Sequence, residues 1–214
     1  YPRNPGLFVV FGTGQLLTTS DLVTTQRQTI YGVWDKPLSS VPYVRANLQQ
    51  QTLTLVNSAT SGLSTNIITA TATTINWSNK VGWFADLPIA GQRLITTPEL
   101  INGAFIATLN TPPLNSCGFG FTSMLLELNF LNGGAFQYAR FDISGDGGFD
   151  IADQYNGAYP VGIGLSNSYA NSPTVLGPNK DNNLVILITQ SDGTQTTVIA
   201  PNITPRKIGW WQIQ

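Results

Sequence analysis

Short segments with a strand-like pattern of apolar and polar residues recur along the whole chain. Residues 50–58, QQTLTLVNS, alternate Leu and Val with Thr over their centre, which is the period of a strand with one buried face. Residues 6–12 and 28–35 are short runs rich in aromatic and β-branched residues, the types that favour strands. Two further runs of this kind lie at 123–130 and 137–143. The pattern predicts an all-β protein.

The connections between these segments contain turn residues rather than helical repeats. Residues 183–201 predict a hairpin, because the Asp-Gly pair within SDGT (191–194) is a strong signal for a tight turn. Residues 19–28 predict one short helical turn with Ser20 as its N-cap. Residues 57–80 are rich in Thr, Ser and Asn and predict extended β structure or a long loop.

The number and spacing of the predicted strands leave three architectures open: a sandwich, a barrel or a propeller. A propeller blade takes about 40–45 residues, so the chain would supply roughly four or five blades. No clear internal repeat selects among the three. We expect residues 1–214 to form one domain that is the C-terminal part of a larger protein. Its last residues, 208–214, are aromatic and β-branched, which predicts an integral strand that includes Trp210 and Trp211.

Composition narrows the functional classes. Only 10% of the residues are charged, and Gly (21) and Pro (13) are frequent, as in an extracellular all-β protein with many turns. The net charge of −1 and the absence of a Lys/Arg cluster disfavour nucleic acid as a partner. No apolar run reaches the ~18 residues of a membrane-spanning helix. With no His, the chain cannot build a Ser-His-Asp triad or a His-ligated zinc site.

The single cysteine, Cys117, cannot form an internal disulfide. It is either a buried free thiol or the partner of a cysteine outside this chain. The sequence does not choose between these two readings.

An acidic segment at 141–153, FDISGDGGFDIAD, is the strongest candidate site. It holds four of the 11 acidic residues of the chain. It follows the calcium-loop pattern D-x-[DN]-x-[DN]-G-x5-E, with the turn glycine at Gly147. Ca²⁺ takes six to eight oxygen ligands, which alternate positions of a tight loop supply. The predicted ligands, with Gly148 acting through its backbone carbonyl, are Asp142, Ser144, Asp146, Gly148, Asp150 and Asp153.

Several features set this segment apart from a full EF-hand. Ser144 is a neutral ligand where Asp or Asn is usual, and Asp153 is one methylene shorter than the usual Glu. Gly157 and Pro160 leave no room for an exiting helix. We therefore expect a loop that links two β elements. The structural alternative is a solvated Asp-Gly turn without an ion, and Mg²⁺ fits less well because it prefers water and strict octahedral geometry.

Two glutamates raise the alternative of a carbohydrate-active enzyme or a lectin-like β domain with a structural calcium site. Glycosidases use a pair of carboxyl groups, and Glu99 and Glu127 are the candidates. In LLELNF, alternation puts Glu127 opposite the core face, which predicts two surface carboxylates. An enzyme is therefore not the expected function.

Several segments, in order along nearly the whole chain, resemble the C-terminal domain of the PilC/PilY family, the large tip-associated proteins of bacterial type IV pili. The first is a Gly-Thr-Gly motif followed by Tyr-x-x-Trp-Asp, and the second combines Gly-Trp, Asp-Leu-Pro and Gly-x-Arg. A Cys-containing stretch, the acidic loop, the segment SPTVLG and an aromatic ending follow. The matching segments are 9–22 with 28–35, 82–100, 117–134, 142–150, 172–177 and 206–214.

The resemblance implies a modified β-propeller with a Ca²⁺ site in the acidic loop. It carries over Asp142, Ser144, Asp146, Asp150 and the carbonyl of Gly148, whereas Asp153 rests on the calcium-loop pattern alone. It further implies a role in pilus assembly, in calcium-linked control of extension and retraction with its effect on twitching motility, and in adhesion. The implied partners are minor pilins or the pilus tip and a host or surface receptor. The implied location is the bacterial cell surface, at the pilus tip or the outer membrane.

Overall fold

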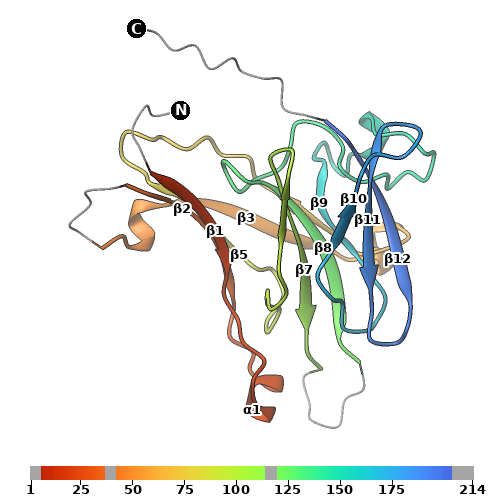
Figure 1. Cartoon of the computed structure of the whole chain (residues 1–214), viewed down its shortest axis with the longest axis horizontal. Helices are drawn as coiled ribbons and strands as arrows, with labels where there is room; N and C mark the ends of the chain where they lie inside the picture. Colours follow the sequence, from red (N-terminus) through yellow and green to blue (C-terminus); the bar gives the residue numbers. More distant parts are fainter. Residues whose placement is uncertain (1–5, 37–41, 114–119, 204–214) are drawn as a thin grey trace, which may run out of the picture.

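The computed structural model describes residues 6–36, 42–113 and 120–203, and it confirms the all-β prediction (Figure 1). Helical structure is limited to single turns: α1 (Thr19–Leu22), α2 (Ser58–Ser61) and the 3-10 turns η1 (Arg45–Asn47) and η2 (Ile151–Asp153). The strands are β1 (Leu7–Gly12), β2 (Thr29–Asp35), β3 (Gln49–Val56), β4 (Ile67–Ala70), β5 (Gly82–Asp86), β6 (Glu99–Ile101), β7 (Ala104–Thr111), β8 (Thr122–Asn129), β9 (Pro160–Gly164), β10 (Thr174–Leu176), β11 (Asn183–Thr189) and β12 (Gln195–Pro201).

Within these residues the strands form two sheets. A curled nine-stranded sheet has the order β1-β2-β5-β3-β4-β9-β8-β7-β6, and a three-stranded sheet has the order β10-β11-β12. Strand β3 joins two parts of the large sheet, since its first half pairs in parallel with β5 and its second half pairs antiparallel with β4. Because β3 belongs to both parts, the strand pairing alone does not divide the sheet into separate blades.

The central strands β7 and β8 are buried on both faces. Phe105, Leu109 and Leu126 lie in a first core, which lines the inside of the curled sheet. Ile106 and Leu125 point the other way, into a second core shared with the three-stranded sheet. Figure 1 shows β10, β11 and β12 beside β7 and β8, opposite the part of the sheet that contains β1 and β2. Both faces of β7 and β8 are therefore largely apolar, as is usual for strands that are covered on both sides.

Trp83 on β5 anchors the first core and accounts for the Gly-Trp motif. Its ring is fully buried, and its indole N–H donates to the carbonyl of Phe130 at 2.9 Å. A Cβ at either Gly32 or Gly133 would overlap the ring, so both positions exclude a side chain. The motif is thus explained by packing.

Most predicted strands are confirmed. The segments 6–12, 28–35, 50–58 and 123–130 correspond to β1, β2, β3 and β8, and the hairpin at 183–201 is formed by β11 and β12. In its turn, Gly193 has a φ of 86°, and the Asp192 carboxylate accepts a hydrogen bond from the Thr194 N–H.

The strand expected at 137–143 was wrong. These residues form bends without ladder pairs. Phe141 and Tyr138 do pack into the second core, which explains their apolar pattern. The N–H of Ile143, however, donates to the Asp153 carboxylate at 2.9 Å rather than to a neighbouring strand. A buried but irregular segment thus gave the same sequence pattern as a strand.

Two further expectations need correction or refinement. The helical turn in 19–28 is present as α1, but its N-cap is Thr18, and Ser20 lies inside the turn. The Thr18 N–H donates to the carboxylate of Asp21, three residues later, so the cap is of the capping-box type. Residues 57–80 contain strand β4, as one of the two readings had it, and also the unexpected turn α2. The predictions for Cys117 and for 208–214, with Trp210 and Trp211, lie outside the described residues.

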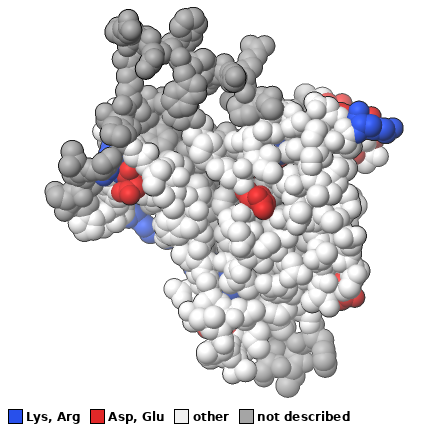
Figure 2. All heavy atoms as spheres, in the orientation of Figure 1, with Lys and Arg blue, Asp and Glu red and all other residues white. Residues whose placement is uncertain are grey.

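The surface drawn in Figure 2 is mostly uncharged, with isolated Lys, Arg, Asp and Glu side chains and no basic patch on that face. This agrees with the low charged fraction of 10%. Among the described residues, no helix has the length and apolar character needed to cross a membrane.

Candidate functional site

The acidic loop lies between β8 and β9, as expected for a loop that links two β elements. Asp142, at its start, accepts hydrogen bonds from the backbone N–H groups of Gly145 at 2.6 Å and Gly147 at 2.8 Å. The Ser144 hydroxyl donates to the same carboxylate at 3.2 Å. Gly145 and Gly147 have φ values of 78° and 85°, a conformation that suits glycine. The glycines therefore let the loop fold around its first carboxylate.

Two further carboxylates approach the backbone of Gly148. The Gly148 N–H donates to Asp146 Oδ1 at 2.8 Å, and the Ala152 N–H donates to Asp150 Oδ1 at 2.7 Å. A Cβ at Gly148 would lie 3.1 Å from Asp146 Oδ1 and 3.7 Å from Asp150 Oδ2. Both side chains are exposed. The position without a side chain is thus flanked by two solvent-accessible carboxylates.

Asp153 differs from the other three acidic residues of the loop because it is fully buried. Its Oδ1 accepts hydrogen bonds from the N–H groups of Ile143 at 2.9 Å and Ser144 at 3.1 Å, and its Oδ2 accepts one from Asp150 at 3.1 Å. These donors come from both ends of the loop. Asp153 therefore ties the loop into a closed shape from within.

The polar groups of the loop were assessed as ligands for a hard cation such as Ca²⁺. For Asp142, burial raises the pKa, but the hydrogen bonds from Gly145, Gly147 and Ser144 outweigh it and hold the pKa below its usual value. The donors are all oxygens, the type that Ca²⁺ prefers. The described residues contain no group of three or more His, Cys, Asp or Glu side chains placed together to hold a metal ion. To bind a cation, the loop would have to use the Ser144 hydroxyl and the Gly148 carbonyl as ligands, and its exposed carboxylates would have to reorient.

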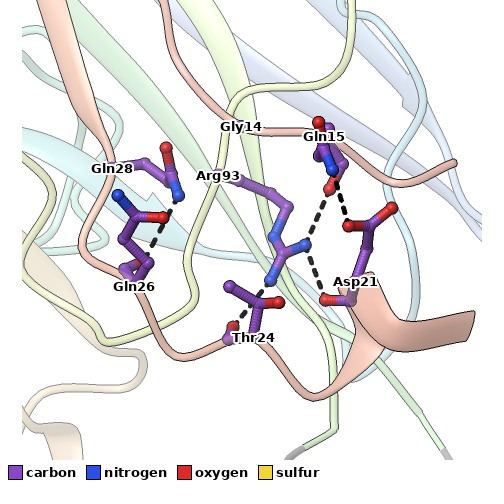
Figure 3. A pocket seen from close by; sticks show the side chains of 7 residues that line it. All are labelled: Gly14, Gln15, Asp21, Thr24, Gln26, Gln28 and Arg93. Carbon is purple, nitrogen blue, oxygen red and sulfur yellow. Dashed lines mark hydrogen bonds between the residues drawn. The ribbon is translucent and has the colours of Figure 1, made fainter. Parts of the chain in front are cut away.

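A second site is a surface pocket beside α1, lined by Gly14, Gln15, Asp21, Thr24, Gln26, Gln28 and Arg93 (Figure 3). Its floor is the side chain of Arg93, which is only 2% exposed. The guanidinium donates to four backbone carbonyls at 2.7–2.9 Å. These belong to Gln15, Asp21, Thr24 and Gly91. The Arg of the Gly-x-Arg motif thus holds the connection between β1 and β2, residues 13–28, to the sheet; this connection is called the α1 loop.

Asp21 also lines this pocket, and its carboxylate oxygens already accept hydrogen bonds from within the chain. It accepts hydrogen bonds from the Gln15 side chain and from the N–H groups of Leu17 and Thr18, each at 2.8 Å. These bonds, that from Gln15 first, lower the pKa of Asp21 well below its ordinary value. The charged groups at Arg93 and Asp21 are therefore engaged within the chain, which marks the pocket as a structural joint.

The prediction that Glu127 is a surface carboxylate was wrong. Alternation does place it opposite the first core, but that face is covered by the three-stranded sheet, so its side chain is fully buried. It forms an ion pair with Arg140, whose Nε donates to Glu127 Oε2 at 2.7 Å. Arg140 also donates to the carbonyl of Pro201 on β12 at 3.0 Å. The pair links the large sheet to the small one.

Glu99 and Glu127 do not form an enzymatic acid pair. The register places both in one cross-strand row, with the buried Ile106 between them. Two strand spacings put their backbones about 10 Å apart. Because Glu127 is sealed in its ion pair with Arg140, it is not available to a substrate.

The buried roles of Arg93 and Arg140 were missed by reading the sequence alone. Arg93 carried a signal, since it belongs to the Gly-x-Arg motif of the resemblance. For Arg140 no signal was present, because its partner Glu127 is 13 residues away and on a different element.

The structure is that of an all-β protein with a curled nine-stranded sheet and an acidic loop between β8 and β9. Comparison with known families agrees: residues 1–66 match the family model described as the PilY1 beta-propeller domain. A "Type IV pilus biogenesis factor PilY1 homolog" of Xylella fastidiosa is 31% identical over 136 residues, which is 61% of this chain and 9% of that protein. The "Type IV pilus biogenesis factor PilY1" of Pseudomonas aeruginosa is 26% identical over 183 residues, 74% of this chain and 16% of that protein.

A second Xylella fastidiosa protein of the same name is 26% identical over 216 residues, which is 97% of this chain and 16% of that protein. The crystal structure of the Pseudomonas aeruginosa PilY1 C-terminal domain superposes with a TM-score of 0.74 at 23% identity, over 94% of this chain and 43% of that one. The resemblance to the C-terminal domain of the PilC/PilY family and the propeller-type fold are thereby confirmed. The chain spans under a fifth of the length of these curated relatives.

Proposed function

We propose that this chain is a calcium-binding region of a type IV pilus-associated protein that acts in pilus assembly, in control of extension and retraction, and in surface adhesion. The observation that carries the pilus role is the similarity to proteins named type IV pilus biogenesis factors, one of which matches 97% of the chain. On this proposal the chain acts at the bacterial cell surface, at the pilus tip or the outer membrane. Its partners are minor pilins or the tip, and a host or surface receptor.

We propose Ca²⁺ in the acidic loop, held by the carboxylates of Asp142, Asp146 and Asp150 with the Ser144 hydroxyl and the Gly148 carbonyl. The support is the all-oxygen donor set, the turn glycines and the two exposed carboxylates beside Gly148. Asp153 carries a fourth charge at the loop. Its three amide donors favour a role in holding the loop closed over one as the main ligand. A bound Ca²⁺ would reduce a local charge of about −4 to about −2.

Titration calorimetry on chelator-stripped protein tests the site. We expect one Ca²⁺ per chain with a Kd on the order of 10⁻⁷ to 10⁻³ M, the range from sensor sites to extracellular modules. Asp146→Ala should abolish the heat. Asp192→Ala is the matched control, since Asp192 is an Asp-Gly turn residue of the β11–β12 hairpin, outside the loop. No heat at millimolar Ca²⁺ in the parent protein would reject the calcium proposal.

We infer a role in binding and assembly rather than in catalysis. A carbohydrate-active enzyme would need a converging carboxylate pair, and Glu127 is instead buried in the ion pair with Arg140. The polar pocket beside α1 has its charged groups occupied by hydrogen bonds within the chain. Neither feature supports a hydrolytic centre.

The regulatory part of the proposal is tested in the parent bacterium. Ordering of a surface loop acts as a switch only if its two states differ in affinity for a partner. Asp146→Ala or Asp150→Ala should alter surface piliation or twitching while the protein still reaches the cell envelope. Loss of the protein from the envelope would indicate a purely structural role for Ca²⁺. Normal piliation, twitching and adhesion in a variant shown not to bind Ca²⁺ would exclude the regulatory role.

A further inference from the structure

The chain contains three Asn-Gly pairs, at 102–103, 132–133 and 156–157. Such pairs are prone to spontaneous loss of the asparagine amide, because glycine has no side chain to shield its backbone nitrogen from reaction. Asparagine is for this reason among the thermolabile residues of proteins. In a folded chain the reaction depends on the surroundings of each pair, and the three surroundings differ.

The third pair, Asn156-Gly157, is exposed and forms a two-residue turn after η2, with φ values of 49° and 78°. Two backbone hydrogen bonds between Tyr155 and Ala158, at 2.9 and 3.1 Å, close the turn as an isolated bridge. Neither the Asn156 side chain nor the Gly157 N–H donates to or accepts from another described residue. A Cβ added at Gly157 would meet no atom within 4 Å. Both reacting groups are thus open to water.

The second pair, Asn132-Gly133, is held at both reacting groups. The Gly133 N–H donates to the carbonyl of Asn129 at 2.7 Å. The Asn132 side-chain oxygen accepts a hydrogen bond from the Gly134 N–H at 3.0 Å. Gly133 is also buried against the ring of Trp83. The nitrogen and the amide of this pair are therefore both engaged within the chain.

The first pair, Asn102-Gly103, is restrained by its side chain and by its strands. The half-buried Asn102 donates from Nδ2 to Asn202 Oδ1 at 2.7 Å. The pair forms the turn between β6 and β7, whose ladder starts at the pairing of Ile101 with Ala104. To react, the asparagine backbone must rotate out of its left-handed conformation, so this ladder has to open locally. At Asn156 only an isolated bridge opposes the same rotation.

We propose that Asn156 is a site of spontaneous deamidation in the folded protein and reacts there faster than Asn102 and Asn132. The Gly157 nitrogen, after loss of its proton, attacks Asn156 Cγ and forms an N–Cγ bond. The Cγ–Nδ2 bond then breaks, and the leaving nitrogen takes up a proton and departs as ammonia. Water opens the resulting succinimide to aspartate or isoaspartate, without any oxidant or reductant.

The product carries one additional negative charge, three residues after Asp153 at the end of the acidic loop. The reaction needs only the chain and water. The inference therefore depends neither on Ca²⁺ nor on the pilus role.

Peptide mapping of the folded full-length protein, aged in heavy-oxygen water at mildly alkaline pH, tests the proposal. Tandem mass spectrometry resolves the three pairs, and incorporated heavy oxygen marks the conversions that precede digestion. Asn156 should convert several-fold faster than Asn102 and Asn132. Its rate should rise with pH, because the nucleophile is the deprotonated nitrogen. Absence of conversion at Asn156, or conversion of either other pair at the same rate, would overturn the proposal.

The same protein aged in denaturant is the control for the effect of the fold. All three pairs should then convert at similar rates, because each is an Asn-Gly pair in an open chain. A ranking that persists after unfolding would mean that the neighbouring sequence selects Asn156, and would contradict the structural argument.

Asn156→Asp supplies the chemical standard, since aspartate tolerates the left-handed conformation as asparagine does. Its peptide should co-elute with one of the two products from the aged parent. A product that matches neither the aspartate standard nor its isoaspartate isomer would refute the succinimide route. Asn102 and Asn132 should convert in this variant as slowly as in the parent, and rapid conversion there would show that the restraints on these pairs do not protect them.

Discussion

The α1 loop and the acidic loop are each organised by one buried charged residue, but they differ in what they leave free. Arg93 donates to four carbonyls of the first loop and its surroundings, and Asp153 accepts from three amides of the second. In the α1 loop the second charged residue, Asp21, is also saturated by hydrogen bonds and is only 6% exposed. In the acidic loop, Asp146 and Asp150 remain exposed.

This difference distinguishes the α1 loop, whose charged groups have a structural role, from the acidic loop, which is a candidate binding site. A buried charge whose hydrogen bonds all end within the chain contributes order and has nothing left to offer a ligand. A loop that satisfies its backbone with one buried carboxylate and keeps others at the surface leaves those exposed carboxylates free to interact with a cation, at the cost of repulsion between like charges. The two loops can therefore be distinguished by how they respond to substitution, to Ca²⁺ and to pH.

The largest effect should come from Arg93→Ala. Removal of the guanidinium leaves the carbonyls of Gln15, Asp21 and Thr24 without their donor in a buried setting, so we expect a loss of about 3–5 kcal/mol in the free energy of unfolding. Denaturant unfolding followed by tryptophan fluorescence measures it, with and without Ca²⁺. The loss should be the same in both conditions.

Arg27→Ala is the control for the removal of an arginine. Arg27 is exposed and donates to the Leu87 carbonyl at 2.9 Å, with a longer contact to Pro88, so its loss should cost less than about 1 kcal/mol. If Arg93→Ala were as mild as Arg27→Ala, the α1 loop would not depend on its buried cation.

A somewhat smaller effect is expected from Asp153→Ala. Three backbone N–H groups lose their acceptor, those of Ile143, Ser144 and Asp150, which should cost about 2–4 kcal/mol. Because the residue is fully buried, the loss should already be present when the protein is unfolded in excess chelator.

Asp146→Ala is the matched variant within the same loop. Its carboxylate is exposed and accepts one backbone hydrogen bond, from Gly148, so its removal in chelator should cost less than about 1 kcal/mol. Ca²⁺ should stabilise the parent protein by about 2.7 kcal/mol at a hundredfold excess over Kd and should leave this variant unchanged. A stabilisation by Ca²⁺ that persists in Asp146→Ala would place the ion elsewhere.

The predictability of the fold differed between elements for physical reasons. Strands with one buried face, such as β3, and the Asp-Gly hairpin were predicted because period and turn chemistry are local. The segment 137–143 was not, because Phe141 is buried without strand pairing. Glu127 was misplaced because alternation reports which face a side chain is on, while the cover over that face comes from β11 and β12, far along the chain.

For the candidate site, the sequence located the loop but did not predict that its acidic residues have different structural roles. The calcium-loop pattern treats Asp142, Asp146 and Asp153 alike as ligands, since it counts only residue types and spacing. The burial of Asp153 depends on how the loop packs against the second core, which spacing does not encode. The ligand set itself stays a prediction until an ion is measured.

The smallest effect is the pH dependence contributed by Asp21. Its folded pKa is lowered, first by the Gln15 hydrogen bond, from an unfolded value of 3.8, so the carboxylate stabilises the fold above that value. The contribution should be lost as the pH falls below 3.8 towards the folded pKa. Thermal melts of the parent and of Asp21→Asn should therefore differ most at neutral pH, and the gap in Tm should narrow between pH 5 and about pH 2. Ca²⁺ should leave this gap unchanged, because Asp21 lies outside the acidic loop. A gap that widens on acidification would have the wrong sign for a lowered pKa and would mean that the hydrogen bonds to Asp21 do not favour its charged form.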